Sequence, residues 1–170
     1  MFELKDHQVK LASVNPRAEI HGEDRVPACD LKIEAACSSE VLIYLHSQLR
    51  QLLFKKNDSP DLVDQVQDSE ALTELRFPKM GPIKWTWEGT GYTLTVDYGL
   101  GDASNIVLGD CEVDNFKIDP MEGGTVNISF RVICHPETAD VGRLCEMIQR
   151  EIQITLAPPE PVSVQELFGE

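Results

Sequence analysis

Alternation of apolar and polar residues dominates this chain and predicts antiparallel β-strands. The clearest example is residues 126–134, whose apolar positions are Val126, Ile128, Phe130, Val132 and Cys134. The positions between them are polar: Thr125, Asn127, Ser129 and Arg131. A period of two is typical of a strand with one buried and one solvent-facing side.

Further strands are predicted on both sides of this stretch. Residues 8–37 alternate around the turn formers Asn15-Pro16 and His21-Gly22-Glu23-Asp24, which indicates an antiparallel pair or triplet. Residues 83–88 and 92–98 alternate around Gly89-Thr90-Gly91, and we interpret them as a hairpin. A second pair consists of 106–118 and 126–134, and residues 152–156 form a last strand.

Helical spacing replaces alternation in two places. The first is an amphipathic segment of about four turns that begins after Ser38 and Ser39 and ends at Phe54. Its apolar positions are Val41, Leu42, Leu45, Leu49, Leu52 and Leu53. The second begins at Glu137 or Thr138, and its apolar positions are Val141, Leu144, Cys145 and Ile148. Ser59-Pro60 also predicts a short helix between them.

These elements predict one α+β domain over residues 1–157, with a twisted antiparallel sheet or a partly open β-barrel and two main helices. Residues 158–170 are expected to be a proline-rich spacer and a short tail. A chain of 170 residues is long enough to bury one ordinary core without disulfides or metal.

The charge is strongly acidic and unevenly distributed. The formal net charge is −14, of which residues 59–170 contribute −13 and residues 1–58 only −1. Hydrophobic residues make up 42% of the chain, so this acidity is not the signature of a disordered protein. It indicates an acidic surface beside a more neutral one.

Targeting signals and disulfide frameworks are not predicted. The N-terminal residues lack the basic and apolar regions of a signal peptide, and no apolar run approaches the length of a membrane span. The five cysteines are widely spaced and odd in number, which is typical of reduced thiols in a cytosol. We therefore expect a soluble cytoplasmic protein without membrane partners.

Motifs for catalysis or metal binding are weak. Gly99–Ser104 lacks the third glycine and following lysine of a phosphate loop, and the acids from Asp110 onward lack the glycine and glutamate of a calcium loop. Cys134-His135 has no partner at zinc-ligand spacing, and no local motif pairs a cysteine with a histidine for nucleophilic catalysis. We expect no enzymatic activity, no metal and no cofactor.

Aromatic residues of the predicted 83–98 hairpin are candidates for stacking on unpaired bases: Trp85, Trp87, Tyr92 and Tyr98. Lysines that could follow the phosphates are Lys84, Lys10 and Lys32, with further cations at Lys5, Arg17, Arg25, Lys79, Lys117 and Arg131. The alternative is that the four rings fill the core.

Acidic residues form a second candidate surface. Asp110, Glu112 and Asp114 share one face of a predicted strand, at intervals comparable to those between the phosphates of a nucleic acid. Asp97, Asp102 and Asp119 are their neighbours in sequence. Such a face could imitate DNA, and the alternative is an ordinary solvated strand face.

The tail is a third candidate, because it presents apolar anchors after a proline spacer: Val164, Gln165, Leu167 and Phe168. It resembles a degenerate bacterial sliding-clamp-binding peptide, with Gln165 one place too close to Leu167. It is also similar to the Phe-bearing acidic tails of single-strand-binding proteins. The alternative is a frayed terminus.

Longer stretches of the chain carry a family resemblance. HGEDRVPACDLKIEA, LRFPKMGPIKW, the block from VDYGLGDASN to RVICHP and the ending LAPPEP resemble uncharacterised proteins of bacteriophages and prophages. This resemblance implies a product made in the bacterial cytoplasm during phage growth, in DNA replication, recombination or counter-defence. It supplies no catalytic residues.

Three functions follow as hypotheses. The first is a non-enzymatic phage protein of DNA replication or recombination that binds single-stranded DNA and recruits a protein, such as a sliding clamp, through residues 162–168. The second is an acidic DNA mimic that inhibits a host nucleic-acid-binding protein or an anti-phage defence protein, such as a CRISPR protein. The third is a virion component. A homo-oligomer is compatible with each.

Overall fold

The fold is a β-barrel, seen in a computed structural model that describes residues 1–58 and 72–161. The barrel strands are β1 (Leu4–His21), β2 (Asp24–Ser38), β6 (Gly89–Val96), β7 (Ile106–Met121), β8 (Thr125–Cys134) and β9 (Glu151–Ala157). The shorter elements are η1 (Ser39–Tyr44), α1 (Leu49–Leu53), β3 (Phe54–Lys55), β4 (Glu74–Leu75), β5 (Ile83–Trp85), η2 (Asp102–Ser104) and α3 (Thr138–Glu146).

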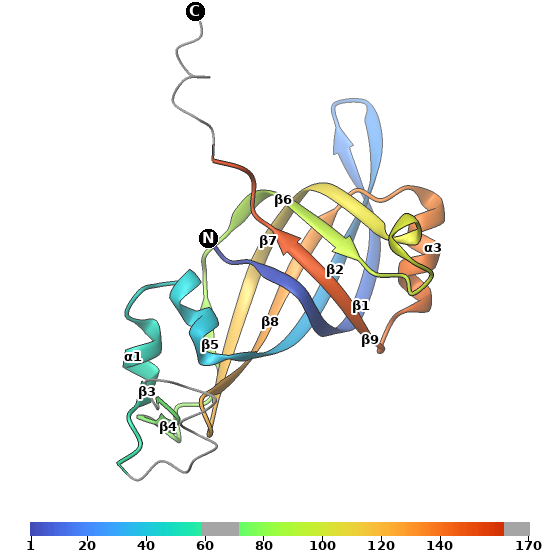
Figure 1. The fold of residues 1–170 in the computed structure, drawn as a ribbon. Coiled ribbons are helices and arrows are strands. Elements are labelled where there is room, and N and C mark those ends of the chain that lie inside the picture. Colours follow the sequence, from blue (N-terminus) through green and yellow to red (C-terminus); the bar gives the residue numbers. More distant parts are fainter. Residues whose placement is uncertain (59–71, 162–170) are drawn as a thin grey trace, which may run out of the picture.

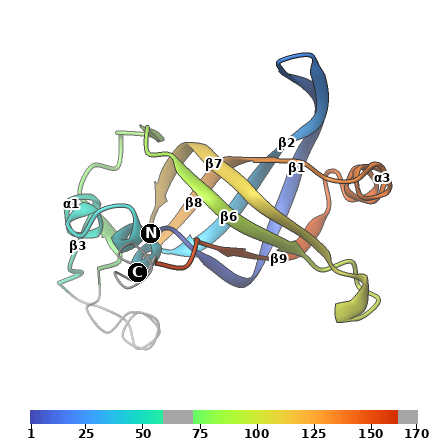
Figure 2. The same cartoon turned by 90° about the horizontal axis from the view of Figure 1, so that it is seen from above.

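Six antiparallel strands close the barrel in the order β7-β6-β9-β1-β2-β8, because β8 pairs again with β7. A seventh strand, β5, pairs with β7 outside this ring. Seen from above, the ring is evident, and α1 and α3 lie on opposite sides of it (Figure 2). The structure is thus mostly β, and the predicted antiparallel barrel is confirmed in its coarse form.

The two N-terminal strands are longer than the barrel. They pair with each other from Lys10 opposite Glu34 to His21 opposite Asp24, whereas β1 pairs with β9 only as far as Lys10. Their far end therefore projects from the barrel as a hairpin (Figure 1). Asn15-Pro16, which we interpreted as a turn, lies inside β1, and the predicted strand pair is otherwise confirmed.

The predicted four-turn helix after Ser38 is wrong. That segment forms the short η1 and α1, separated by a turn and followed directly by β3. Tertiary contacts explain the break, because Ser39 donates its backbone N–H to Gly124 between β7 and β8, and Arg50 donates Nε–H to the Ser39 hydroxyl. The two short helices thereby fold against one end of the barrel.

The predicted hairpin over residues 83–98 is also wrong. The two segments do not pair with each other; β5 pairs with β7 at Phe116–Ile118, and β6 pairs with β7 at Ile106–Val113. They follow one another along the same edge of β7, which is long enough to accept both. Residues 86–88 therefore separate two strands that pair with the same side of β7, and they do not form the tight turn of a hairpin.

Other expectations are confirmed. The alternating residues of β8 put Val126, Ile128, Phe130, Val132 and Cys134 in the core. α3 forms with Glu137 as its N-cap and Leu144 is buried, but Cys145 and Ile148 of the predicted buried stripe are exposed. The predicted short helix after Ser59 lies outside the described residues.

Side chains fill the barrel interior. An aromatic cluster joins the N-terminus to two strands, with the ring centroids of Phe2 and Phe116 5.0 Å apart and those of Phe116 and Phe130 5.5 Å apart. Aliphatic residues from all six strands complete the core. Since the inward positions are occupied by this packing, outward positions must carry any binding function.

Candidate functional site: an outer face with free lysines

One row of outward residues crosses the sheet at the level where β5 joins it. Successive strand registers place the row in the order Lys84, Lys117, Ser129, Glu34, Lys10 and Glu151. These residues come from β5, β7, β8, β2, β1 and β9, so segments far apart in sequence meet on one surface. We call this surface the lysine row.

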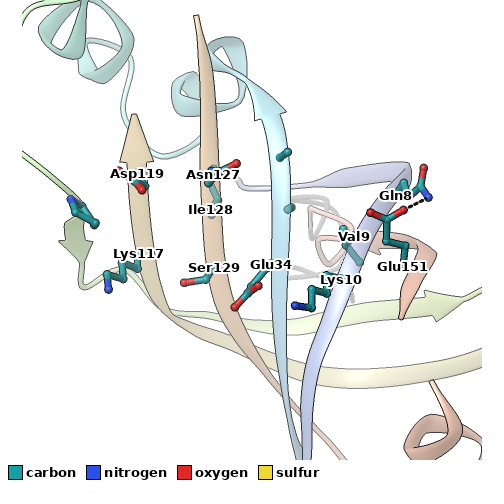
Figure 3. A pocket seen from close by; sticks show the side chains of 13 residues that line it. Gln8, Val9, Lys10, Glu34, Lys117, Asp119, Asn127, Ile128, Ser129 and Glu151 are labelled. Carbon is teal, nitrogen blue, oxygen red and sulfur yellow. Dashed lines mark hydrogen bonds between the residues drawn. The ribbon is translucent and has the colours of Figure 1, made fainter. Parts of the chain in front are cut away.

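A hollow of about 430 Å³ lies over the middle of the lysine row. Its lining includes Lys117, Ser129, Glu34, Lys10 and Glu151 from the row, and Asp119 and Asn127 from the row beside it. Figure 3 shows the side chains of Lys117, Ser129, Glu34 and Lys10 side by side on four adjacent strands. The Gln8 amide donates to Glu151 at 2.8 Å at the far end.

The three lysines of the row differ from five other cations of the protein, which are held in ion pairs. Ion pairs hold Arg17, Lys32, Lys55, Arg131 and Arg143 to carboxylates within the described residues. Within the same part of the chain, no ion pair joins Lys84, Lys117 or Lys10 to an acidic side chain. Their ammonium groups are therefore open to an external anion.

A second, smaller hollow of about 230 Å³ adjoins the first on the same face. Both are lined by Ser129, and the second is also lined by Lys32, Arg131, Asp30 and Asn115. Arg131 makes two hydrogen bonds to Asp114, of 2.8 and 2.6 Å. The two hollows make a continuous polar path over the outer side of β7, β8, β2 and β1.

The predicted aromatic and basic residues do not share a surface. Lys84 points outward, whereas its neighbours Ile83 and Trp85 are partly buried against the core. Trp87 is also partly buried and packs edge-on against Tyr92 and Phe116, with centroids 6.3 and 5.6 Å away. Neither tryptophan is fully buried.

The two tyrosines have structural partners. Tyr92 is completely buried, and burial raises the pKa of its phenol to about 12. Tyr98 donates its hydroxyl to Glu146 at 2.8 Å, and the guanidinium of Arg143 lies 4.1 Å above its ring. The alternation that suggested a stacking surface thus arose from residues that pack against the core and α3.

The three predicted lysines do lie on one outer surface. Lys84 and Lys10 belong to the lysine row, and Lys32 lines the adjoining hollow. The residues predicted from the sequence did not include Asn127, Ser129, Glu34 and Gln8, and Lys117 was named only as a further cation. For Asn127 and Ser129 the signal was present, since they formed the polar side of the clearest alternating strand.

The six predicted acidic residues are dispersed. Asp97 and Asp102 lie in the connection between β6 and β7, where Asp97 accepts a hydrogen bond from Gly99 N–H. Asp110 and Glu112 are exposed on β7, but Asp114 is paired with Arg131, and Asp119 lines the larger hollow beside Lys117. The tail residues Val164, Gln165, Leu167 and Phe168 lie outside the described residues.

Among the described residues, one cysteine lies close to a histidine, because Sγ of Cys37 is 3.6 Å from Nε2 of His7. Burial raises the pKa of the Cys37 and Cys111 thiols to about 11, which disfavours the reactive thiolate. No group of three or more His, Cys, Asp or Glu side chains within residues 1–58 and 72–161 is arranged to hold a metal ion. No helix in the described part of the chain has the length and apolarity needed to cross a membrane.

Comparison with known proteins yields no relative. No family model matches the chain, and neither a curated protein nor a solved structure is detectably similar to it. Function must therefore be argued from the outer face alone.

Proposed function

We propose that this protein is a non-enzymatic binding protein for single-stranded DNA, and that the strand lies across the lysine row. The observation that carries the proposal is the position of Lys84 directly opposite Lys117 in the β5–β7 pair. Like charges in directly opposed positions destabilise a sheet. An anionic ligand that lies between the two ammonium groups turns this repulsion into attraction.

The dimensions of the row fit a short stretch of sugar-phosphate backbone. Adjacent strands are about 4.8 Å apart, so Lys117 on β7 and Lys10 on β1 are separated by about 14 Å across three strand spacings. Phosphates bound at the Lys84–Lys117 pair and at Lys10 would place a nucleotide over the larger hollow. Ser129 and Asn127 line that hollow and offer hydrogen-bonding groups to a base edge.

Binding of this kind is dominated by phosphate contacts. The partly buried Trp85 and Trp87 do not line either hollow, so base stacking is not required by this arrangement. We therefore expect modest affinity, weak sequence preference and strong salt dependence. The acidic remainder of the protein discourages binding elsewhere on its surface.

A role in phage DNA replication or recombination fits such a protein. In that setting, residues 162–168 would recruit a protein partner while the barrel holds the DNA strand. This second part of the proposal rests on the sequence of the tail alone.

Fluorescence anisotropy of a labelled single-stranded oligonucleotide tests the proposal, measured at about 50 and 200 mM salt beside a duplex of equal length. The Lys84→Gln/Lys117→Gln variant should bind about tenfold more weakly at the lower salt, with a shallower dependence on salt concentration. Removal of the opposed charges should also leave its melting temperature unchanged or higher.

Arg25→Glu is the matched control, because Arg25 is an exposed cation near the tip of the projecting hairpin, away from the lysine row. It changes the net charge by two units, as the double variant does, and should leave binding nearly unchanged. Equal weakening by both variants would mean that only net charge matters. The proposal is wrong if the unmodified protein does not bind the single strand at low salt.

A further inference from the structure

A third hollow, of about 370 Å³, lies at the end of the barrel where β7 turns into β8. Its apolar lining includes Leu53, Leu75, Phe77, Met80, Pro120 and Met121. These residues come from the end of α1, from β4 and the turn after it, and from the end of β7. Figure 1 shows α1, β3 and β4 together at this end of the barrel. We call this site the methionine hollow.

Hydrogen bonds fix the walls of the methionine hollow. Arg76 donates its Nε–H to the backbone carbonyl oxygens of Gln51 at 2.7 Å and Phe54 at 3.1 Å, which ties β4 to α1 and β3. The backbone N–H of Gly123 donates to the carbonyl oxygen of Thr73 at 2.9 Å, which ties the same segment to the β7–β8 turn. The hollow is therefore already formed in the protein alone, and a ligand need not order it.

Large apolar side chains are exposed around this hollow. Phe77, Met80 and Met121 have relative exposures of 58%, 44% and 42%, and Leu52 on α1 has 58%. A hydrogen bond of 3.0 Å from the N–H of Met80 to the carbonyl oxygen of Phe77 closes the turn that presents these two side chains. Exposed apolar side chains gathered around a hollow are typical of a protein-binding site. Methionine side chains adapt easily to the shape of a partner.

The charged residues that line the methionine hollow are both acidic, namely Asp119 and Glu122. Within residues 1–58 and 72–161, no ion pair joins either carboxylate to a cation. Lys79 belongs to the neighbouring turn but does not line the hollow. A partner that inserts an apolar side chain here is therefore favoured if it also carries a cation beside that side chain.

The same charge argument disfavours other copies of this chain as the occupant. The protein has a formal net charge of −14, so two copies repel each other. The tail segment 162–170 contains Glu166 and Glu170 and neither lysine nor arginine. It would bring further negative charge to Asp119 and Glu122.

We propose that the methionine hollow binds a short basic, amphipathic segment of another protein. The segment inserts a leucine or aromatic side chain into the hollow and places a lysine or arginine against Asp119 or Glu122. The volume is at the lower end of the range for ligand pockets, so one or two anchoring side chains fill it. The affinity should be on the order of 10 µM. This inference is independent of the proposed DNA binding.

Two synthetic amphipathic peptides of about 14 residues test the proposal by isothermal titration calorimetry at about 50 mM salt. Both carry leucine and phenylalanine on one side of the helix, and their polar positions are lysine in one and glutamate in the other. The lysine peptide should bind at least about tenfold more tightly. Glu122→Gln should weaken its binding about threefold.

Phe77→Ser removes an apolar wall of the hollow and should weaken binding of the lysine peptide about tenfold. Leu100→Ser is the matched control, because Leu100 is also an exposed apolar residue, with a relative exposure of 78%. It lies in the connection before β7, whereas the methionine hollow lies at the far end of that strand. Binding by this control should equal that of the unmodified protein.

Methyl NMR of the methionines locates the bound peptide. The chain has four methionines, and the methyl signals of Met80 and Met121 should shift as the lysine peptide is added. The signal of Met147, which is buried beside α3, should stay in place.

Each contrary result overturns the proposal. Equal binding of the two peptides, or no binding of the lysine peptide at millimolar protein, excludes a basic partner. Equal affinities of Phe77→Ser and Leu100→Ser for the lysine peptide would show attraction by net charge alone. Tighter binding of a peptide of residues 158–170, or self-association that Phe77→Ser abolishes, would identify another copy of the chain as the occupant. Phe77→Ser should not change DNA binding, so either proposal can fail without the other.

Discussion

The hydroxyl of Tyr92 donates a hydrogen bond of 2.9 Å to the backbone carbonyl oxygen of Phe2. Both residues are completely buried, so this bond fixes the N-terminal segment to β6 inside the core. It connects positions 90 residues apart, and it explains why a polar atom is tolerated at that depth.

Tyr92→Phe should therefore lower the free energy of unfolding by about 1–2 kcal/mol, because the Phe2 carbonyl loses its buried donor while the ring packing is kept. Urea denaturation followed by circular dichroism measures this change. The proposed DNA binding should not change, since Tyr92 is buried and does not belong to the lysine row. Unaltered stability would show that the Phe2 carbonyl finds another donor.

Gly89 leaves room for the ring of Trp87. A Cβ atom at this position would lie 2.6 Å from Cη2 of Trp87 and 2.6 Å from Cε2 of Tyr92. We expect Gly89→Ala to destabilise the protein by about 1–3 kcal/mol through displacement of Trp87, with a change in tryptophan fluorescence. Gly109→Ala is the control, because a Cβ there meets no atom within 4 Å, and its melting temperature should stay close to that of the unmodified protein.

Glu19 should contribute stability that disappears in acid. Its pKa in the folded protein is about 2, below the ordinary value of 4.5, because the hydrogen bonds from His135 and His21 and the neighbouring Arg17 favour the charged form. A lowered pKa stabilises the fold above pH 4.5, and this contribution is lost as the pH falls toward 2. The difference in urea midpoint between the unmodified protein and Glu19→Gln should therefore be largest near pH 5 and shrink toward pH 2.5. A constant difference over this range contradicts the prediction.

Thiol reactivity should be confined to one cysteine. Cys145 is exposed, whereas Cys29, Cys37, Cys111 and Cys134 are buried, and burial raises the thiol pKa of each of these four. Iodoacetamide at pH 8 should add one group to the native protein, and five only after denaturation. Intact-mass spectrometry measures the number of groups, and Cys145→Ser should abolish the native modification. Rapid modification of two or more thiols would indicate that the barrel opens readily.

Local patterns were sufficient for much of the sheet. The alternation of residues 126–134 identified the inward side of β8 because a strand must turn alternate side chains to opposite faces. The turn at His21–Asp24 likewise defined the β1–β2 hairpin. Charge and polarity also drew attention to Lys84, Lys10 and Lys32, which the structure places on the outer face.

Tertiary structure decided the remainder. Leu42 and Leu49 have the spacing of one helix, yet Leu42 lies in η1 and Leu49 in α1, and both are buried on either side of the break. Alternation could not reveal that β5 and β6 share the edge of β7, because pairing partners are chosen by long-range packing.

The lysine row shows which features the sequence determined and which the tertiary structure decided. The sequence by itself determined that Lys84, Lys117 and Lys10 would occupy the polar side of strands, since each lies between apolar neighbours that seek the core. Only the pairing of β5 with β7 decided that Lys84 faces Lys117, and only the strand order in the barrel placed Lys10 three strand spacings away from Lys117. Strand order and register are global properties of the packed core, and they convert separate polar positions into one surface.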